Sequence, residues 1–314
     1  MGNGWVENKP IMTPSDRVRI GIDWGGTKIE ALAMDAAGCE LRRVRIPTPR
    51  NDYEGSIRAA VEMVALIELE VGTTGPIGVG IPGTVVAATG LVKNANSTWL
   101  NGRPLEKDLS VALGRQVRCV NDANCLAVSE AVDGAAAGKA VVFAAILGTG
   151  CGAGIALDGR MHLGLNGLAG EWGHNPLPWQ SPDEYPGDPC YCGQRGCIEQ
   201  WLSGPALEED YRRASGFSLP GVEIAAAAEA GEPQAVAALE RYEHRLARAF
   251  AHVVNLLDPD IIVLGGGLSR IERLYRNVPP QIADWVFGKS AATAVVPAKH
   301  GDSSGVRGAA RLWP

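Results

Sequence analysis

Two segments of the chain share one order of hydrophobic and polar positions. Residues 17–47 read as three short strands, with a glycine turn after the first. Residues 140–162 read as a strand, a glycine turn and a second strand, closed by Asp158-Gly159, which favours a tight hairpin. Strands joined by such short turns pair in an antiparallel manner. The pattern therefore predicts two halves, each opened by antiparallel strands around a glycine turn.

Helices and further strands follow each opening. In the first half, apolar residues on one stripe predict a helix around 57–67, and short apolar runs at 77–83 and 116–120 read as strands. In the second half, a long amphipathic helix around 239–253 leads into a buried strand and a glycine turn at 258–267. This alternation of strands and helices predicts an α/β fold.

Length and charge narrow the classes of function. A chain of 314 residues has room for two domains. Its formal net charge of -6, without a Lys/Arg run, argues against a nucleic-acid partner. The uncharged stretch 140–157 contains too many glycines for a membrane-spanning helix. Residues 1–16 lack the apolar core of a signal peptide, so we expect a flexible lead-in on a cytoplasmic protein.

Three glycine turns stand at the ends of predicted strands, at residues 25–27, 148–150 and 265–267. Glycine lets backbone N–H groups approach an anion closely, so three such turns together suggest a phosphate-binding site, although each alone is more often a plain turn. The sequence GTGCGA at 148–153 also fits a dinucleotide pattern. A strand follows it where that pattern needs a helix, which disfavours NAD.

Six motifs, taken in chain order, resemble those of the ROK sugar kinases, a family of repressors, unassigned reading frames and kinases. They are GIDWGGTKIEALAMD, VNDANCLAVSEA, ILGTGCGAGIALDG, GLAGEWGHNP, CYCGQRGCIEQWLSG and LDPDIIVLGGGLS. Three stretches, VKNANSTWLNG, EWGHNPLPW and HGDSSGVRGAA, are similar to bacterial fructokinases (mannofructokinases) within that family. The likeness runs from about residue 17 to the C-terminus.

The resemblance implies a fold and its domains. We expect two actin-like, RNase-H-like α/β domains around an interdomain cleft, with a small zinc-bound loop. The N-terminal domain would span residues 17–122 and the C-terminal domain 123–302, with the zinc loop at 174–197. A helix near 303–314 would pack back on the first domain. The family also implies ATP, Mg²⁺, a hexose substrate and a homodimer.

The implied reaction transfers the γ-phosphoryl group of ATP to the 6-hydroxyl of fructose. Asp122, matched to the family's general base, would take the proton of that hydroxyl, and capping of a helix is its alternative or additional role. The implied sugar-binding residues are Gly83, Asn96, Asn121, Asp122, Glu171, His174 and Glu199. The implied ATP-binding residues are Asp23, Gly25, Gly26, Thr27, Lys28, Gly148, Thr149, Gly150, Gly265 and Gly266. Asp23 is also the candidate ligand of Mg²⁺, with capping of a turn as its alternative.

Other functions are compatible with the same motifs. A glucokinase, a mannokinase or an N-acetylhexosamine kinase of the same family would use the same hydroxyl-binding residues. A sugar-responsive repressor is a remote alternative, because about sixteen residues before the first strand are too few for a helix-turn-helix module.

Three of the seven cysteines lie within residues 190–197, which read CYCGQRGC. We expect Cys190, Cys192 and Cys197 to bind one structural Zn²⁺ with His174, as a closed set of four ligands. A disulfide between Cys190 and Cys192 would close a strained ring and leave Cys197 unpaired. A nucleophilic cysteine is weaker still, because phosphoryl transfer to a hydroxyl needs no covalent intermediate. The other four cysteines are expected to be buried free thiols: Cys39, Cys119, Cys125 and Cys151.

Overall fold

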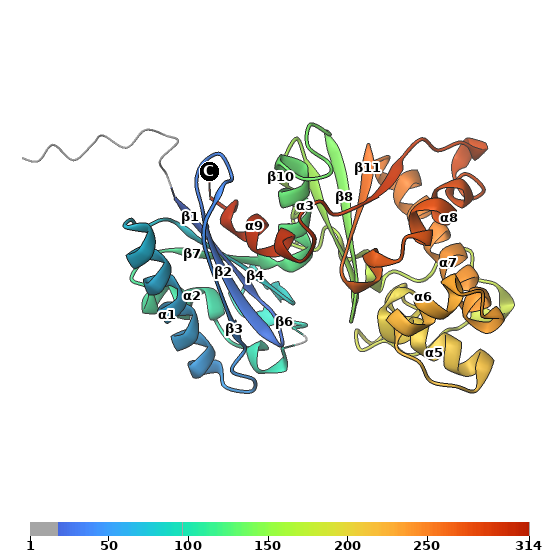
Figure 1. Ribbon diagram of the computed structural model, residues 1–314, viewed down its shortest axis with the longest axis horizontal. Coiled ribbons are helices and arrows are strands. Elements are labelled where there is room, and N and C mark those ends of the chain that lie inside the picture. The colour runs from blue at the N-terminus through green and yellow to red at the C-terminus, as the bar shows by residue number, and fades with distance from the viewer. Residues whose placement is uncertain (1–17, 96, 314) are drawn as a thin grey trace, which may run out of the picture.

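Each half of the protein is built on a five-stranded sheet, and the two sheets share one strand order (Figure 1). The computed structural model describes residues 18–95 and 97–313, so the expected lead-in 1–16 lies outside the described residues. The first sheet runs β3 (Glu40–Pro47), β2 (Lys28–Met34), β1 (Arg19–Trp24), β4 (Ile77–Ile81) and β7 (Val117–Asn121). The second runs β10 (Arg160–Met161), β9 (Cys151–Leu157), β8 (Val141–Leu147), β11 (Ile261–Gly265) and β12 (Ala294–Pro297).

Both sheets combine an antiparallel meander with two parallel strands. In the first sheet, β1 and β2 pair antiparallel, as do β2 and β3, while β4 and β7 are added in parallel beyond β1. The second sheet repeats this pattern from β8 outward. Every residue of β4 and β11 is buried, as expected of central parallel strands that read as continuous apolar runs. Two copies of this arrangement confirm the predicted actin-like α/β fold.

Two helices fill the space between the sheets (Figure 1). Helix α3 (Asp122–Val132) packs on β8 and β9, and α9 (Ser304–Ala310) packs on β1 and β4. The two helices also touch each other, because Gly308 has no side chain: a Cβ there would lie 1.8 Å from the carbonyl oxygen of Cys125. The C-terminal helix thus lies against the first sheet. The domain limits at 122 and 302 stay predictions.

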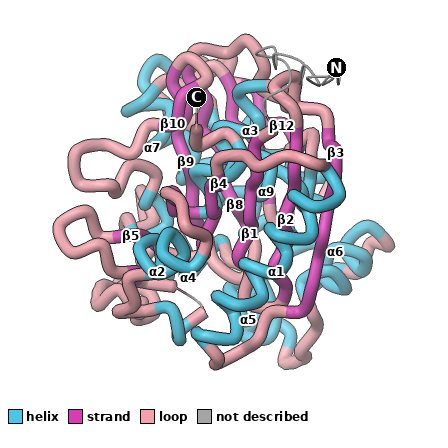
Figure 2. The backbone as a smooth tube through the Cα atoms, turned by 90° about the vertical axis from the view of Figure 1, so that its left-hand side faces the viewer, coloured by secondary structure: helices cyan, strands magenta, loops and turns pink. Residues whose placement is uncertain are grey.

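The outer faces of the two sheets carry the remaining helices. Helices α1 (Tyr53–Val71) and α2 (Leu105–Ala112) cover the first sheet and lie in front of it in Figure 2. Asp52 caps the start of α1, and Gly72 ends it with a left-handed backbone. The second sheet is covered by α7 (Pro233–Leu257), around which pack α4 (Glu199–Leu202), α5 (Gly204–Ser215), α6 (Gly221–Glu229) and α8 (Arg273–Ile282). No helix among the described residues has both the length and the apolarity to cross a membrane.

Candidate active site

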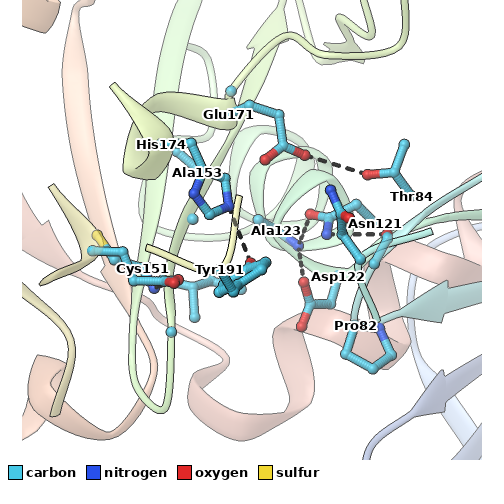
Figure 3. A pocket seen from close by; sticks show the side chains of 17 residues that line it. Pro82, Thr84, Asn121, Asp122, Ala123, Cys151, Ala153, Glu171, His174 and Tyr191 are labelled. Atoms are coloured by element: carbon cyan, nitrogen blue, oxygen red, sulfur yellow. Dashed lines mark hydrogen bonds between the residues drawn. The ribbon is translucent and has the colours of Figure 1, made fainter. Parts of the chain in front are cut away.

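Six of the seven predicted sugar-binding residues line one pocket, and the ends of parallel strands supply those of the first half (Figure 3). Parallel neighbours end at the same edge of a sheet, so Gly83 after β4 and Asp122 after β7 lie near each other. The opposite wall comes from the second half, through β9 and the segment around Glu171. The pocket holds about 120 Å³. Its lining includes Gly83, Thr84, Asn94, Asn121, Asp122, Gly150, Glu171, His174, Tyr191 and Glu199.

Asp122 stands at the first residue of α3, at the floor of this pocket. Its Oδ1 accepts a hydrogen bond from the Ala123 N–H at 2.8 Å, and the Oδ1 of Asn121 accepts from the same N–H at 2.9 Å. Asn121 is the capping residue of α3, and its amide also donates to the carbonyl oxygen of Gly83. Capping therefore does not need the second oxygen of Asp122. Burial raises the pKa of Asp122 to about 6, so the carboxylate is ionised at neutral pH and is a stronger base than an exposed one.

Asp23, at the end of β1, carries the second perturbed carboxyl. Burial, together with the negative charges of Asp122 and Glu30, raises the pKa of Asp23 to about 7. Gly305 of α9 adjoins it, since a Cβ there would lie 3.4 Å from the carboxyl group. A cation bound beside Asp23 would be attracted by these negative charges and would favour its ionised form. Asp23 therefore fits a Mg²⁺ ligand on the strength of its donor chemistry and its surroundings.

The segment after β10 places Glu171 and His174 by burying Trp172 between them. Trp172 stacks on Phe250 of α7 with ring centroids 5.4 Å apart, which fixes the short 3₁₀ turn Glu171–His174. Glu171 then faces the first half of the protein, where the Thr84 hydroxyl donates to its Oε1 at 3.3 Å (Figure 3). This hydrogen bond joins the two halves across the pocket.

Glu199 and the glycine turns form the side of the site that belongs to the second sheet. Glu199 Oε2 accepts from the Cys151 N–H at 2.9 Å, and a Cβ on Gly150 would lie 2.8 Å from the same oxygen. The turn at 148–150 also adjoins the turn after β11, because a Cβ on Gly148 would lie 3.8 Å from the Gly267 nitrogen. Gly266 has a φ of 83°, and a Cβ there would meet the Leu147 carbonyl oxygen at 2.4 Å, so this position requires glycine.

The predicted ATP-binding residues are divided between the two sheets. Gly25, Gly26 and Thr27 form the turn between β1 and β2, closed by a hydrogen bond from the Gly25 N–H to the Lys28 carbonyl at 2.9 Å. Gly150 is shared with the pocket, whereas the other predicted ATP-binding residues lie outside its lining: Asp23, Gly25, Gly26, Thr27, Lys28, Gly148, Thr149, Gly265 and Gly266. Asn96 lies outside the described residues.

Three lining residues that carry a hydroxyl or amide side chain were not predicted from the sequence, namely Thr84, Asn94 and Tyr191. Thr84 and Glu171 are 87 positions apart in the sequence, so no local sequence pattern predicts their hydrogen bond. Tyr191 does carry a local signal, because it stands between two cysteines whose positions the predicted metal site would fix.

The three cysteines of the loop converge with His174. Their ligand atoms all lie within 4.8 Å of one another, with Cys192 and Cys197 Sγ 3.6 Å apart and Cys190 Sγ 3.6 Å from His174 Nδ1. A tetrahedral zinc with Zn–S of about 2.3 Å and Zn–N of about 2.0 Å places such atom pairs roughly 3.5 to 3.8 Å apart. The four residues therefore fit a structural zinc ion. The Nε2 of His174 faces the other way and meets the Tyr191 hydroxyl at 3.0 Å.

The seven cysteines are all free, so the cluster is not a disulfide in this structure. Cys119, Cys125 and Cys151 are buried thiols, as expected. The expectation for Cys39 was wrong: it is exposed, because it lies in the turn between β2 and β3.

A buried ion-pair network also holds the loop between His174 and Cys190. Glu184 receives hydrogen bonds from Arg245 at 2.9 Å and from Arg248 at 2.7 Å, both on α7. Burial alone would raise the pKa of Glu184, but these two guanidinium groups hold it at about 2. The loop is thus fixed to α7 at its middle and gathered at its ends by the Cys/His cluster.

Comparisons with known proteins give the family. The ROK family model matches residues 19–314. The chain is 39% identical over 296 residues to a protein of Pectobacterium atrosepticum named N-acetyl-D-glucosamine kinase, covering 93% of this chain and 97% of that protein. It is 40% identical over 296 residues to a protein of the same name from Photobacterium profundum, covering 93% and 98%.

Solved structures support the same family. A ROK hexokinase from Thermus thermophilus superposes with a TM-score of 0.83 at 32% identity, covering 93% of this chain and 96% of that one. A ROK glucokinase from Streptomyces griseus, in complex with glucose and AMPPNP, gives a TM-score of 0.78 at 30% identity, covering 94% and 98%. Because the family match and these relatives extend over nearly the whole sequence, the chain belongs to the ROK family, and these relatives are sugar kinases.

Proposed function

We propose that this protein is an ATP-dependent kinase that phosphorylates the 6-hydroxyl of N-acetyl-D-glucosamine. The observation that carries the choice of sugar is the identity of 39% and 40%, over nearly full length, with two proteins named N-acetyl-D-glucosamine kinase. This support favours the N-acetylhexosamine alternative over fructose, which the sequence motifs had suggested. Glucose is the second candidate acceptor, because the Streptomyces relative is a glucokinase at 30% identity.

Asp122 is the proposed general base. It lines the pocket at the start of α3, and one of its oxygens is free of the contact with the Ala123 N–H. As the new P–O bond forms, the sugar hydroxyl becomes acidic, and a carboxylate with a pKa of about 6 accepts its proton. Such a base contributes about 10² to 10⁴ in rate.

The acceptor-rich lining supports a role in binding hydroxyl and amide N–H groups. Glu171, Glu199 and Asp122 offer carboxylate oxygens as acceptors, and the Asn121 amide and the His174 ring also line the pocket. Gly83 lets the segment after β4 pack closely against Ala95, because a Cβ there would meet the Ala95 backbone at 2.9 Å. Asn96 is proposed from the family resemblance alone. The full proposed set is Gly83, Asn96, Asn121, Asp122, Glu171, His174 and Glu199.

The glycine turns are the proposed ATP site. Backbone N–H groups of such turns hold phosphate oxygens, and Lys28 adds a positive charge beside the first turn. Bound Mg²⁺ would offset the phosphate charge, with Asp23 as its proposed protein ligand. The full proposed set is Asp23, Gly25, Gly26, Thr27, Lys28, Gly148, Thr149, Gly150, Gly265 and Gly266.

The Cys/His cluster is the proposed site of a structural zinc ion, with ligands His174, Cys190, Cys192 and Cys197. Four protein ligands leave no open position for chemistry, so bound zinc would order the loop. Zinc sites of this kind contribute roughly 10 to 16 kcal/mol of binding free energy, which favours the ordered loop. The ordered loop then places Glu171 and Glu199 on either side of the sugar. We also propose a homodimer, as the family resemblance implies.

Product analysis tests the proposed function. Purified protein incubated with ATP, Mg²⁺ and N-acetyl-D-glucosamine should release ADP, and phosphorus NMR of the product should show a monoester on the 6-hydroxyl. ADP release without a sugar phosphate, or no release with any hexose, would contradict the proposal.

A further inference from the structure

Tyr191 lines the pocket from the loop that carries the three cysteines. Its neighbours in sequence, Cys190 and Cys192, both belong to the Cys/His cluster, so its backbone position is set by that cluster. Its ring meets the ring of His174 edge-on, with centroids 5.1 Å apart, and its hydroxyl lies 3.0 Å from Nε2 (Figure 3). The side chain is 61% exposed, so a sugar entering the pocket can reach it.

The direction of the hydrogen bond between these two rings follows from the other ring nitrogen. The Nδ1 of His174 faces Cys190 Sγ at 3.6 Å, where a thiol hydrogen or a metal ion takes its lone pair. The ring hydrogen of His174 then sits on Nε2, which donates to the Tyr191 oxygen. A phenol that accepts from Nε2 keeps its own O–H free to donate elsewhere.

The polar groups of the pocket create a need for such a donor. Asp122, Glu171 and Glu199 are carboxylates, which in the ionised form accept hydrogen bonds and cannot bind a carbonyl oxygen. Other donors of the lining are partly or fully engaged, since one hydrogen of the Asn121 amide goes to Gly83 and the Thr84 hydroxyl donates to Glu171. A sugar hydroxyl can turn to donate to a carboxylate, whereas the carbonyl oxygen of an acetamido group has no hydrogen to give.

We propose that Tyr191 is a specificity-determining residue whose hydroxyl donates to the carbonyl oxygen of the substrate's acetamido group. This inference rests on the proposed function and adds to it the group that distinguishes N-acetyl-D-glucosamine from glucose. A site with a donor placed for this carbonyl gains a hydrogen bond with the amide, while the 2-hydroxyl of glucose satisfies itself on a neighbouring carboxylate.

The test compares Tyr191→Phe with the wild type on both sugars. The variant should lose about two- to tenfold in kcat/KM for N-acetyl-D-glucosamine, the size of one neutral hydrogen bond, and should stay within about twofold for glucose. Calorimetric binding of each sugar without ATP should show the same selective loss, and the zinc content should equal that of the wild type. Tyr185→Phe is the matched control, because Tyr185 is an exposed tyrosine of the same loop and lies outside the pocket lining.

Three outcomes would overturn this role. An equal loss for both sugars would mean that Tyr191 only positions His174. A selective loss in Asn94→Gly without one in Tyr191→Phe would assign the carbonyl to Asn94, another residue of the lining. If the wild type prefers N-acetyl-D-glucosamine and Tyr191→Phe keeps the same selectivity, the proposed role of Tyr191 is refuted while the proposed function stands. If the wild type shows no such preference, the proposed function is refuted as well.

Discussion

Replacing Asp122 by Asn separates the chemical role of this residue from its structural one. The Asn side chain keeps the shape and the Oδ1 atom that accepts from the Ala123 N–H, so the start of α3 should stay intact. The variant loses the negative charge and with it the proposed general base. We expect kcat to fall by about 10² to 10⁴, equivalent to roughly 3 to 5 kcal/mol in the barrier.

The same substitution should make the protein more stable at neutral pH. Burial raises the pKa of Asp122 from 3.8 to about 6, so the folded state disfavours the ionised form. A shift of about two units corresponds to as much as roughly 3 kcal/mol, which opposes folding above pH 6 and vanishes below the unfolded pKa near 3.8. Asn removes this opposition, so the free energy of unfolding should rise at pH 7.5 and change little near pH 4.

Two assays on one set of variants check both statements. Steady-state ADP release gives kcat, and denaturant unfolding at pH 7.5 and pH 4 gives the free energy of unfolding. Asp183→Asn is the control, since this exposed carboxylate lies outside the pocket lining. The wild type should also lose kcat/KM as the pH falls through about 6. A kcat within tenfold of the wild type would remove Asp122 from the mechanism, and a less stable Asn variant would refute the electrostatic argument.

Three further substitutions test the supports of the site. Cys192→Ser should lower the zinc content from about one ion per chain and raise the sugar KM, while Cys39→Ser, at an exposed thiol elsewhere, should change neither. Metal analysis that shows no zinc in a fully active wild type would contradict the proposed zinc site. Glu184→Gln should lower the free energy of unfolding by about 3 kcal/mol at pH 7, because Arg248 is left buried beside a neutral partner. The wild type should lose this contribution as the pH falls from 4.5 towards 2, and equal stability of variant and wild type at pH 7 would contradict the prediction. Thr84→Val should raise the sugar KM by about two- to tenfold with kcat nearly unchanged, and an unaltered KM would show that the bond to Glu171 is dispensable.

The parts of the fold that were predictable are those set by neighbours in sequence. Short glycine turns force β1 to pair with β2 and β8 with β9, and these pairs are visible in the hydrophobic pattern. Helices α5 and α6 were not predicted. The first of them buries only Leu207 and Tyr211, which leaves too weak an apolar stripe to stand out from a polar loop.

The site divides in the same way. Asp122 and the cysteines stand in local motifs, so the sequence alone predicts them as site residues. The hydrogen bond from Thr84 to Glu171 and the ion pair of Glu184 with Arg248 join residues 87 and 64 positions apart, and only the packed chain brings them together. The choice of sugar depends on the shape and hydrogen-bonding pattern of the pocket wall, which no single motif contains.

A comparison of acceptor sugars at a fixed ATP and Mg²⁺ concentration decides most directly whether this protein is an N-acetyl-D-glucosamine kinase. Values of kcat/KM should be measured on the purified protein for N-acetyl-D-glucosamine, N-acetyl-D-mannosamine, glucose, mannose and fructose by coupled ADP release. We expect the highest value for N-acetyl-D-glucosamine, with the phosphate on the 6-hydroxyl. A higher kcat/KM for fructose, or for glucose, would contradict the proposed function.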